Sequence, residues 1–401
     1  MGVLADRLQR YPFLGSGRFV AAALGHFVVD FMNSQRPLLL AAFSVMFGLS
    51  NTEVGFFAMN ATLMAALSQP LFGWLADRYG GRWIAALALA WMGVFYIWVG
   101  LWQDPKVLWL LVLASLGSAA FHPQGAMNAA QSGGDKRTLA TSMFFTAGQM
   151  ALGLGPALGG ILLATFGVSV MTVIGAVALP VALFLWVYTP AGGTATAEHV
   201  RAAMHREAQG FGQGRQRWWL LSIFVILVFL RSWAGHSNIA FLPKFLQEQG
   251  WPQEMQGFAL TAYMLTSAFA VIVFGRLADE FGRQRMLTLG LASAVLPLYL
   301  YPRAEGWWLF LLIALTGAFI GGVHSILIVM AQNLLPSHMA LASGLALGFM
   351  FASGAIGQMI TGVLADAFGL DVTLSALSVP LMVAAGLSRL LPRPSEAPSL
   401  K

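Results

Sequence analysis

Long apolar runs separated by short polar segments extend along the whole chain. Each run is long enough for a helix that crosses a bilayer, which takes about 20 apolar residues for a ~30 Å hydrocarbon core. The first six runs are predicted at 18–46, 53–75, 83–103, 106–130, 138–165 and 168–190. The second six are predicted at 217–246, 255–277, 285–302, 306–335, 339–365 and 371–391. The pattern therefore predicts an all-α membrane protein with twelve transmembrane helices.

One polar stretch, rich in Gly, Ala, Gln and Arg, separates the two sets of six runs. Such a composition is typical of a linker between structural units. The predicted domains are an N-terminal six-helix bundle over 1–190, a cytoplasmic linker over 191–216 and a C-terminal six-helix bundle over 217–401.

The two halves repeat each other without gaps at an offset of 202 positions. The segment GWLADRYGGRW begins at Gly73, and GRLADEFGRQR begins at Gly275. The same offset carries His122 onto His324. Both halves begin on the same side of the membrane, so they are predicted to be parallel repeats about an axis along the membrane normal. Two similar bundles that rock about a central site would give alternating access to that site.

The composition excludes most soluble classes of protein. Hydrophobic residues make up 58% of the chain and charged residues 9%, whereas a soluble domain has about 25% charged residues. The chain has no Cys, which removes disulfide frameworks, thiolate metal ligands and cysteine nucleophiles. It also has no P-loop, no H-E-x-x-H and no G-x-S-x-G motif. We expect no enzyme activity and no cofactor, while a receptor that binds a ligand without transporting it remains an alternative.

The charge distribution predicts the orientation in the membrane. Of the 22 Lys and Arg residues, 17 fall on predicted cytoplasmic segments and three on outside segments. Cytoplasmic loops of membrane proteins carry such an excess, so both termini are predicted to be cytoplasmic and the net charge of +6 does not indicate nucleic-acid binding. A removable signal peptide is not expected, because the first apolar run is too long. We expect a monomer that spans the inner (plasma) membrane in contact with the lipid bilayer.

The repeated segment resembles the signature loop between helices 2 and 3 of the major facilitator superfamily, in the form G-x-L-A-D-R-x-G-x-R. The resemblance implies the major facilitator fold and a cytoplasmic conformational latch that steadies the outward-open state. The residues that it assigns to the latch are Gly73, Asp77, Arg78, Arg82, Gly275 and Asp279. In the second copy Glu280 and Gln284 replace two basic residues, which predicts a weaker latch there. The alternative is a basic loop that serves only to orient the chain.

A glycine-rich segment in the fifth run resembles the core of a motif associated with antiporters of this superfamily. It is formed by Gly155, Pro156, Gly159 and Gly160, and Ala151 stands where the family has an upstream glycine. Small residues let helices pack closely, and proline bends a helix. The resemblance favours export, and the alternative is close packing without any bearing on direction.

The first run carries ionisable residues at membrane depth, where they are costly and mark functional sites. His26, Asp30 and Asn33 fall on one helix face, and Arg36 borders that face. A lone carboxylate in a low dielectric holds a proton more tightly, as a proton-coupling site requires, and His26 one turn away can relay that proton. We therefore expect Asp30 and His26 to couple transport to protons. The alternative is a structural ion pair between Asp30 and Arg36 or Arg231.

Further polar residues in the runs are candidates for substrate binding. The segment Phe121-His122-Pro123-Gln124 resembles the F-H-P-E sequence of the fosmidomycin-resistance branch of the superfamily, with Gln124 in place of the Glu. Arginine forks would suit an anionic substrate, and aromatic and methionine side chains would suit a drug-like one. The candidate substrate-binding residues are Asn33, Arg36, His122, Gln124, Arg231, His236, Asn238 and His324.

These observations predict a secondary transporter that works by alternating access. Its partners would be protons and a small organic molecule, either anionic or drug-like, and export is favoured. One alternative is uptake of a small organic anion. The other is transport of a transition-metal ion, which imidazole and carboxylate ligands suit, although no short-spaced histidine motif supports it and no resident metal is expected.

Overall fold

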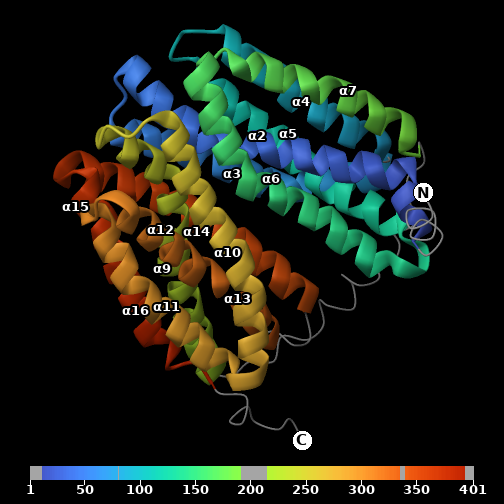
Figure 1. Cartoon of the computed structure of the whole chain (residues 1–401). Helices are drawn as coiled ribbons and strands as arrows, with labels where there is room; N and C mark the ends of the chain where they lie inside the picture. The colour runs from blue at the N-terminus through green and yellow to red at the C-terminus, as the bar shows by residue number, and fades with distance from the viewer. Residues whose placement is uncertain (1–10, 80, 191–214, 335–338, 393–401) are drawn as a thin grey trace, which may run out of the picture. The chain divides into compact units, whose positions relative to one another are not determined.

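The computed structural model describes residues 11–79, 81–190, 215–334 and 339–392. Within these ranges all regular secondary structure is helical and no strand occurs. The predicted all-helical fold is confirmed, whereas nearly all of the predicted linker 191–216 lies outside the described residues (Figure 1).

The helices follow the predicted apolar runs closely. The first half contains α2 (Gly17–Phe47), α3 (Asn51–Tyr79), α4 (Gly81–Leu101), α5 (Val107–Ser132), α6 (Arg137–Phe166) and α7 (Val170–Tyr188). The second half contains α9 (Arg215–Glu248), α10 (Gln253–Phe281), α11 (Arg283–Leu300), α12 (Gly306–Gly322), α13 (His324–Leu334), α14 (Met339–Phe368), α15 (Leu370–Ala376) and α16 (Ser378–Ser388). Short 3-10 turns lie at Pro12–Gly15, Gly134–Lys136 and Tyr301–Arg303.

Two predicted helices are interrupted in the structure. The run 306–335 breaks at Val323 into α12 and α13, directly after a Gly-Gly pair that weakens a helix. The run 371–391 breaks at Leu377 into α15 and α16. Pro380 follows that break and has no N–H to bond the carbonyl of Ala376, which removes one helical hydrogen bond at this point.

Ten helical segments in the described part of the chain are long and apolar enough to cross a membrane. The protein is therefore a multi-pass membrane protein, and the count of twelve spans stays a prediction. Helices α2 and α11 are not among the ten. Helix α2 is long enough at 31 residues, about 46 Å at 1.5 Å per residue. The helix is continuous, but its apolar sequence contains three charged residues, Arg18, Asp30 and Arg36.

The helices gather into two compact units. The first comprises residues 1–42 and 61–202, and the second comprises 43–60 and 203–401. The end of α2 and the start of α3 thus cluster with the second unit, whereas the predicted division placed residues 1–190 in one bundle and 217–401 in the other, with a linker over 191–216.

In the first unit, α4 packs against α5 and α7, and α5 packs against α6 (Figure 1). The closest approach joins α4 to α7, where a side chain on Gly93 would lie 2.7 Å from the carbonyl of Gly175. Tyr96 of α4 donates its hydroxyl proton to the carbonyl of Met32 in α2. This hydrogen bond joins α2 to α4.

In the second unit, Asp366 near the end of α14 caps the start of α3. Its two carboxylate oxygens accept the backbone N–H groups of Asn51 at 2.7 Å and Thr52 at 2.8 Å. The helices touch closely here, since a side chain on Gly55 would lie 2.6 Å from a carbonyl of α14. A carboxylate at a helix N-terminus meets unbonded N–H groups and the positive end of the helix dipole.

Candidate functional site

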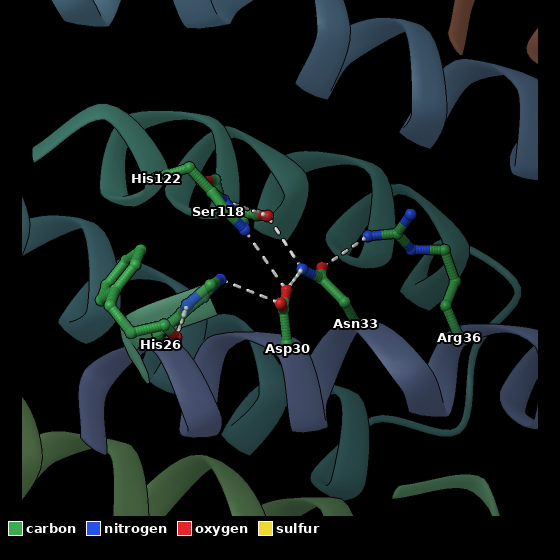
Figure 2. A network of polar contacts seen from close by, with 7 residues as sticks. His26, Asp30, Asn33, Arg36, Ser118 and His122 are labelled. Atoms are coloured by element: carbon green, nitrogen blue, oxygen red, sulfur yellow. Dashed lines mark hydrogen bonds and ion pairs between the residues drawn. The ribbon is translucent and has the colours of Figure 1, made fainter. Parts of the chain in front are cut away.

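A cluster of polar side chains surrounds Asp30, in the middle of α2 (Figure 2). His26 precedes it by one turn and Asn33 follows by one turn, so the three side chains share the face predicted from the sequence. Pro37 lies one further turn along and has no N–H, which leaves the carbonyl of Asn33 without its helical hydrogen bond.

The Asp30 carboxylate has three side-chain partners. Oδ2 lies 3.1 Å from Nε2 of His26, and Oδ1 lies 3.4 Å from Nε2 of His122 on α5. Oδ1 also accepts a hydrogen bond from the amide of Asn33 at 3.1 Å. The side chain of His26 is 3% exposed and that of His122 is 27% exposed. The carboxylate is therefore buried and bridges two imidazoles.

The outer nitrogens of both rings are held by backbone carbonyls. Nδ1 of His26 lies 2.8 Å from the carbonyl oxygen of Phe144 on α6. Nδ1 of His122 lies 2.7 Å from the carbonyl oxygen of Ser118, one turn earlier on α5. Because a carbonyl oxygen only accepts hydrogen bonds, each Nδ1 is the donor, and each Nε2 is directed at Asp30.

An arginine joins the cluster through an amide. Nη2 of Arg36 donates to Oδ1 of Asn33 at 3.1 Å, and Nδ2 of Asn33 donates to Asp30 and, at 2.8 Å, to Oγ of Ser118. The arginine thereby fixes which end of the amide faces the carboxylate. Nε of Arg36 is buried and has no hydrogen-bond partner in the described residues.

Aromatic rings and a glycine enclose the pair of His26 and Asp30. The imidazole of His26 stacks on the ring of Phe144, with centroids 4.1 Å apart and an angle of 18°. Gly148 on α6 faces both polar groups, and a side chain there would lie 2.5 Å from Nε2 of His26 and 2.6 Å from Oδ2 of Asp30. The absence of a side chain at this position makes room for the pair.

This geometry shows what surrounds Asp30 in this conformation. Two imidazoles and an amide contact the carboxylate. No Arg of the described residues lies within ion-pair distance of Asp30, and Arg36 reaches it only through Asn33. The Asp–Arg lock therefore stays an alternative without a direct ion pair in this conformation.

The sequence did not reveal Ser118, Phe144 or Gly148 as parts of the site. Ser118 has a weak signal, because it lies one turn before His122 on the same helix. Gln124, a predicted substrate-binding residue, is 2% exposed and its Oε1 has no hydrogen-bond partner in the described part of the chain. No hydrogen bond joins it to the Asp30 cluster.

The candidate residues of the second half form their own contacts in the second unit. Nε and Nη2 of Arg231 donate to the carbonyl of Ile320 at 3.1 and 2.7 Å. Nδ1 of His236 lies 3.0 Å from the carbonyl of Ser232. Tyr301 donates to Oδ1 of Asn238 at 2.7 Å. His324 begins α13, directly after the break at Val323.

Arg231 is the notable charge in this group. It is 6% exposed, and no carboxylate of the described residues lies within 4 Å of its guanidinium. His236 lies five residues later on the same helix, α9. A buried cation without a carboxylate partner is costly, and this local cluster carries positive charge only.

The two glycines of the predicted latch show no close helix approach in this conformation. A side chain on Gly73 would meet no atom within 4 Å, and one on Gly275 would meet only a serine hydroxyl at 3.8 Å. Arg82 donates to the carbonyl of Trp186 at 2.7 Å and lies over that ring. Asp279 lies 3.9 Å from Arg283 at the surface. Arg78 is exposed and lies 5.6 Å from the ring centroid of Trp74, and the side chain of Asp77 lies outside the described residues.

The glycine-rich segment of α6 packs directly against α2. Gly155 and Gly159 face Ser34 and Gln35, so that any side chain at either glycine would overlap them. Nε2 of Gln35 donates to the carbonyl of Gly155 at 3.1 Å, while Pro156 and Gly160 are buried beside them. The same face of α6 contacts α2 at Gly148, beside the Asp30 cluster.

The ring nitrogens and a carboxylate oxygen of His26, Asp30 and His122 all lie within 4.8 Å of one another, a spacing that a divalent metal ion could bridge. The three groups come from α2 and α5 alone. The other candidate histidines of the runs, His236 and His324, belong to the other unit. The hydrogen bonds described above already account for the cluster.

A family model described as Major Facilitator Superfamily matches residues 22–252 and 223–401. The chain is 26% identical to the fosmidomycin resistance protein of Escherichia coli over 367 residues, which cover 86% of each protein. It is 25% identical to the multi-drug resistance efflux pump PmrA of Streptococcus pneumoniae, over 90% of this chain and 91% of that one.

Solved structures share the fold. A bacterial homologue of the human lysosomal transporter Spinster, in an inward-facing and unoccupied conformation, matches with a TM-score of 0.76 at 17% identity, over 93% of this chain and 96% of that one. The nucleoside transporter NupG matches with a TM-score of 0.71 at 13% identity, over 93% and 96%.

Proposed function

The chain belongs to the major facilitator superfamily, and on that premise we propose that it exports a small organic molecule in exchange for protons. Members of this family are transporters, so the protein is a transporter and not an enzyme. The proposal includes twelve spans in two parallel repeats, alternating access between them, an inner-membrane location with both termini cytoplasmic, and a monomeric state.

The observation that carries the proton-coupling proposal is the buried carboxylate between two imidazoles. Asp30 contacts Nε2 of both His26 and His122, and both rings are anchored at Nδ1 by carbonyls. A proton gained or lost here changes the charge of a buried cluster that joins α2, α5 and α6. Burial makes such a change energetically large, so protonation can favour one conformation over another.

Export is supported by the named relatives and by the packing of α6. Two similar proteins are named for drug resistance or multidrug efflux. The glycine-rich segment at Gly155 and Gly159 seats α6 on α2 beside the proton site, where a change in the cluster can alter the packing of the two helices. The latch role of Gly73, Asp77, Arg78, Arg82, Gly275 and Asp279 stays part of the proposal.

The proposed substrate is a drug-like or anionic organic molecule. Arg231 carries the anionic option, because it is buried and has no carboxylate partner in the described residues. Arg36 adds a second guanidinium, whose Nε has no hydrogen-bond partner among the described residues. Asn33, His122, Gln124, His236, Asn238 and His324 complete the proposed binding set. Uptake of a small organic anion is the alternative that these same charges favour, whereas nothing in the named relatives supports metal transport.

The test begins with growth protection in a bacterial host that lacks its own efflux pumps. Cells that express the wild type or Asp30→Asn are challenged with phosphonate antibiotics, lipophilic cations, organic acids and divalent metals. A protected compound is then followed in proteoliposomes with an imposed pH gradient. Asp135→Asn is the matched control, because this carboxylate is exposed on the surface.

We expect the wild type and Asp135→Asn to accumulate the compound only when a pH gradient is present. Asp30→Asn should fold and insert normally but lose gradient-driven accumulation. Equal pumping by Asp30→Asn would overturn the coupling assignment. Sensitisation of cells by the wild type would replace export with uptake.

A further inference from the structure

The hydrogen bonds around Asp30 determine how many protons the cluster contains. A backbone carbonyl has no proton to donate, so the carbonyls of Phe144 and Ser118 require a hydrogen on Nδ1 of His26 and of His122. A neutral imidazole carries only one N–H. In the neutral form of each ring, the single N–H is therefore the one on Nδ1, and Nε2 has no hydrogen.

Each Nε2 nevertheless faces an oxygen of Asp30, at 3.1 Å for His26 and 3.4 Å for His122. Without a proton between them, a nitrogen lone pair would face the lone pairs of a carboxylate, which is repulsive. With one proton in each contact, the shorter contact of His26 becomes a charge-assisted hydrogen bond and the longer contact of His122 becomes an attractive ion pair. The two contacts together require two protons.

We infer that the cluster of His26, Asp30 and His122 binds two protons in this conformation, one in each contact of a ring with the carboxylate, and that the proton on His122 exchanges first. The inference rests on the proposed function for its role in transport. With both protons bound, the cluster holds two imidazolium rings and one carboxylate, a net charge of +1. Loss of one proton leaves it neutral, and loss of both leaves −1.

The order of release follows from distance and exposure. The contact of His122 with Asp30 is 0.3 Å longer than that of His26, and the side chain of His122 is 27% exposed against 3% for His26. His26 is also fixed between its carbonyl and the stacked ring of Phe144. The proton on His122 is therefore bound more weakly and has the shorter route to water.

Other charged or titratable groups around the cluster favour this arrangement. On α2, Arg36 acts on Asp30 through Asn33 and stabilises the carboxylate as an anion. On α4, Tyr96 bonds the carbonyl of Met32 and does not contact the carboxylate. The α6 groups that face the cluster, around Phe144 and Gly148, are not titratable.

Loss of the first proton, the one on His122, has a mechanical result. The Nε2 lone pair of His122 would then face Oδ1 of Asp30, and the ring cannot turn away without giving up its bond to Ser118. The repulsion would act between α5 and α2. Exchange of two protons for one neutral or anionic molecule would also move net positive charge inward, so the membrane potential would drive transport as well as the pH gradient.

The experiment is ¹⁵N NMR of the full-length protein in lipid nanodiscs, with its seven histidines labelled and no substrate or gradient present. Ring-nitrogen shifts distinguish protonated from unprotonated Nδ1 and Nε2. His26→Gln and His122→Gln assign the signals. His236 is the internal reference, since its Nδ1 also bonds a carbonyl but no carboxylate of the described residues lies within 4 Å of its ring.

We expect both N–H groups on both cluster rings at low pH, and Nε2 of His122 losing its proton before that of His26 as the pH rises. Nδ1 should stay protonated on both rings throughout. In a parallel proton count by pH indicator, His122→Gln should release one proton fewer than the wild type over this range.

An unprotonated Nδ1 on either ring, release of His26 before His122, or an unchanged proton count in His122→Gln would each overturn the inference. A single exchangeable proton with intact gradient-driven transport would overturn it and leave the proposed function standing. Two protons in the spectra together with transport that ignores the pH gradient would refute the proposed function instead.

Discussion

The substitution Gly148→Ala tests whether the contact between His26 and Asp30 is the one that matters for coupling. The new methyl group would lie 2.5 Å from Nε2 of His26 and 2.6 Å from Oδ2 of Asp30, whereas ordinary contact begins at 3.4 Å. The groups must move by about 0.9 Å to restore normal packing. A hydrogen bond of 3.1 Å does not survive such a displacement.

The expected magnitude follows from the lost hydrogen bond. A hydrogen bond to a charged group contributes about 1.5–3 kcal/mol, which corresponds to a roughly 10- to 150-fold change in an equilibrium constant. The contact with His26 would stabilise the protonated cluster. If the contact is lost, a higher proton concentration is needed to protonate the cluster. Half-maximal gradient-driven transport should therefore shift to lower outside pH by about one to two units.

The assay is initial export rate in proteoliposomes as a function of outside pH, with the compound found in the growth screen. Gly386→Ala on α16 is the matched control, because a side chain at that glycine would meet nothing within 4 Å. Gly148→Ala in a His26→Gln background completes a double-mutant cycle, in which the second change should add little.

An unchanged pH profile in Gly148→Ala, with protein of normal thermal stability, would refute the reasoning. Equal shifts in Gly148→Ala and Gly386→Ala would refute it too, because the effect would then belong to any new methyl group on a helix.

Two other substitutions address the second unit. Asp366→Asn should lower the free energy of unfolding by about 0.5–2 kcal/mol, since an amide offers one acceptor oxygen where the carboxylate accepts two N–H groups of α3; a thermal melt equal to that of the wild type would contradict the capping role. Arg231→Ala should weaken binding of an anionic compound far more than that of its neutral amide or ester, measured by isothermal titration, and equal losses for both would rule out the anionic substrate.

The spacing of residues in the sequence was sufficient to place the α2 part of the site. His26, Asp30 and Asn33 recur at helical intervals, so any helix brings them to one face. The sequence also marked His122, through its repeat partner His324, but not as a partner of Asp30. That contact depends on how α2 and α5 are rotated against each other, which packing decides.

The hydrogen-bond acceptors of the two Nδ1 atoms could not be predicted from the sequence. The acceptors are the backbone carbonyls of Phe144 and Ser118, and every residue has a carbonyl. The break before α16 had a visible signal in Pro380, but prolines also lie inside unbroken helices here, as Pro156 does in α6. Neighbouring helices can compensate for the missing bond, so proline alone did not predict the interruption.

The polarity of α2 has a consequence for how the protein is made. Asp30 and Arg36 lie near the middle of a helix that is not apolar enough to qualify as a membrane span, and each such charge costs about 2.5–3.5 kcal/mol during insertion. The serine that bonds Asn33 lies 85 residues later in the chain, roughly 5–20 s of synthesis at typical rates. During biogenesis, Asn33 and Asp30 of α2 therefore have no contact with Ser118 and His122 until α5 has been synthesised. The charged residues of α2 thus make its stable insertion depend on a helix that is synthesised later.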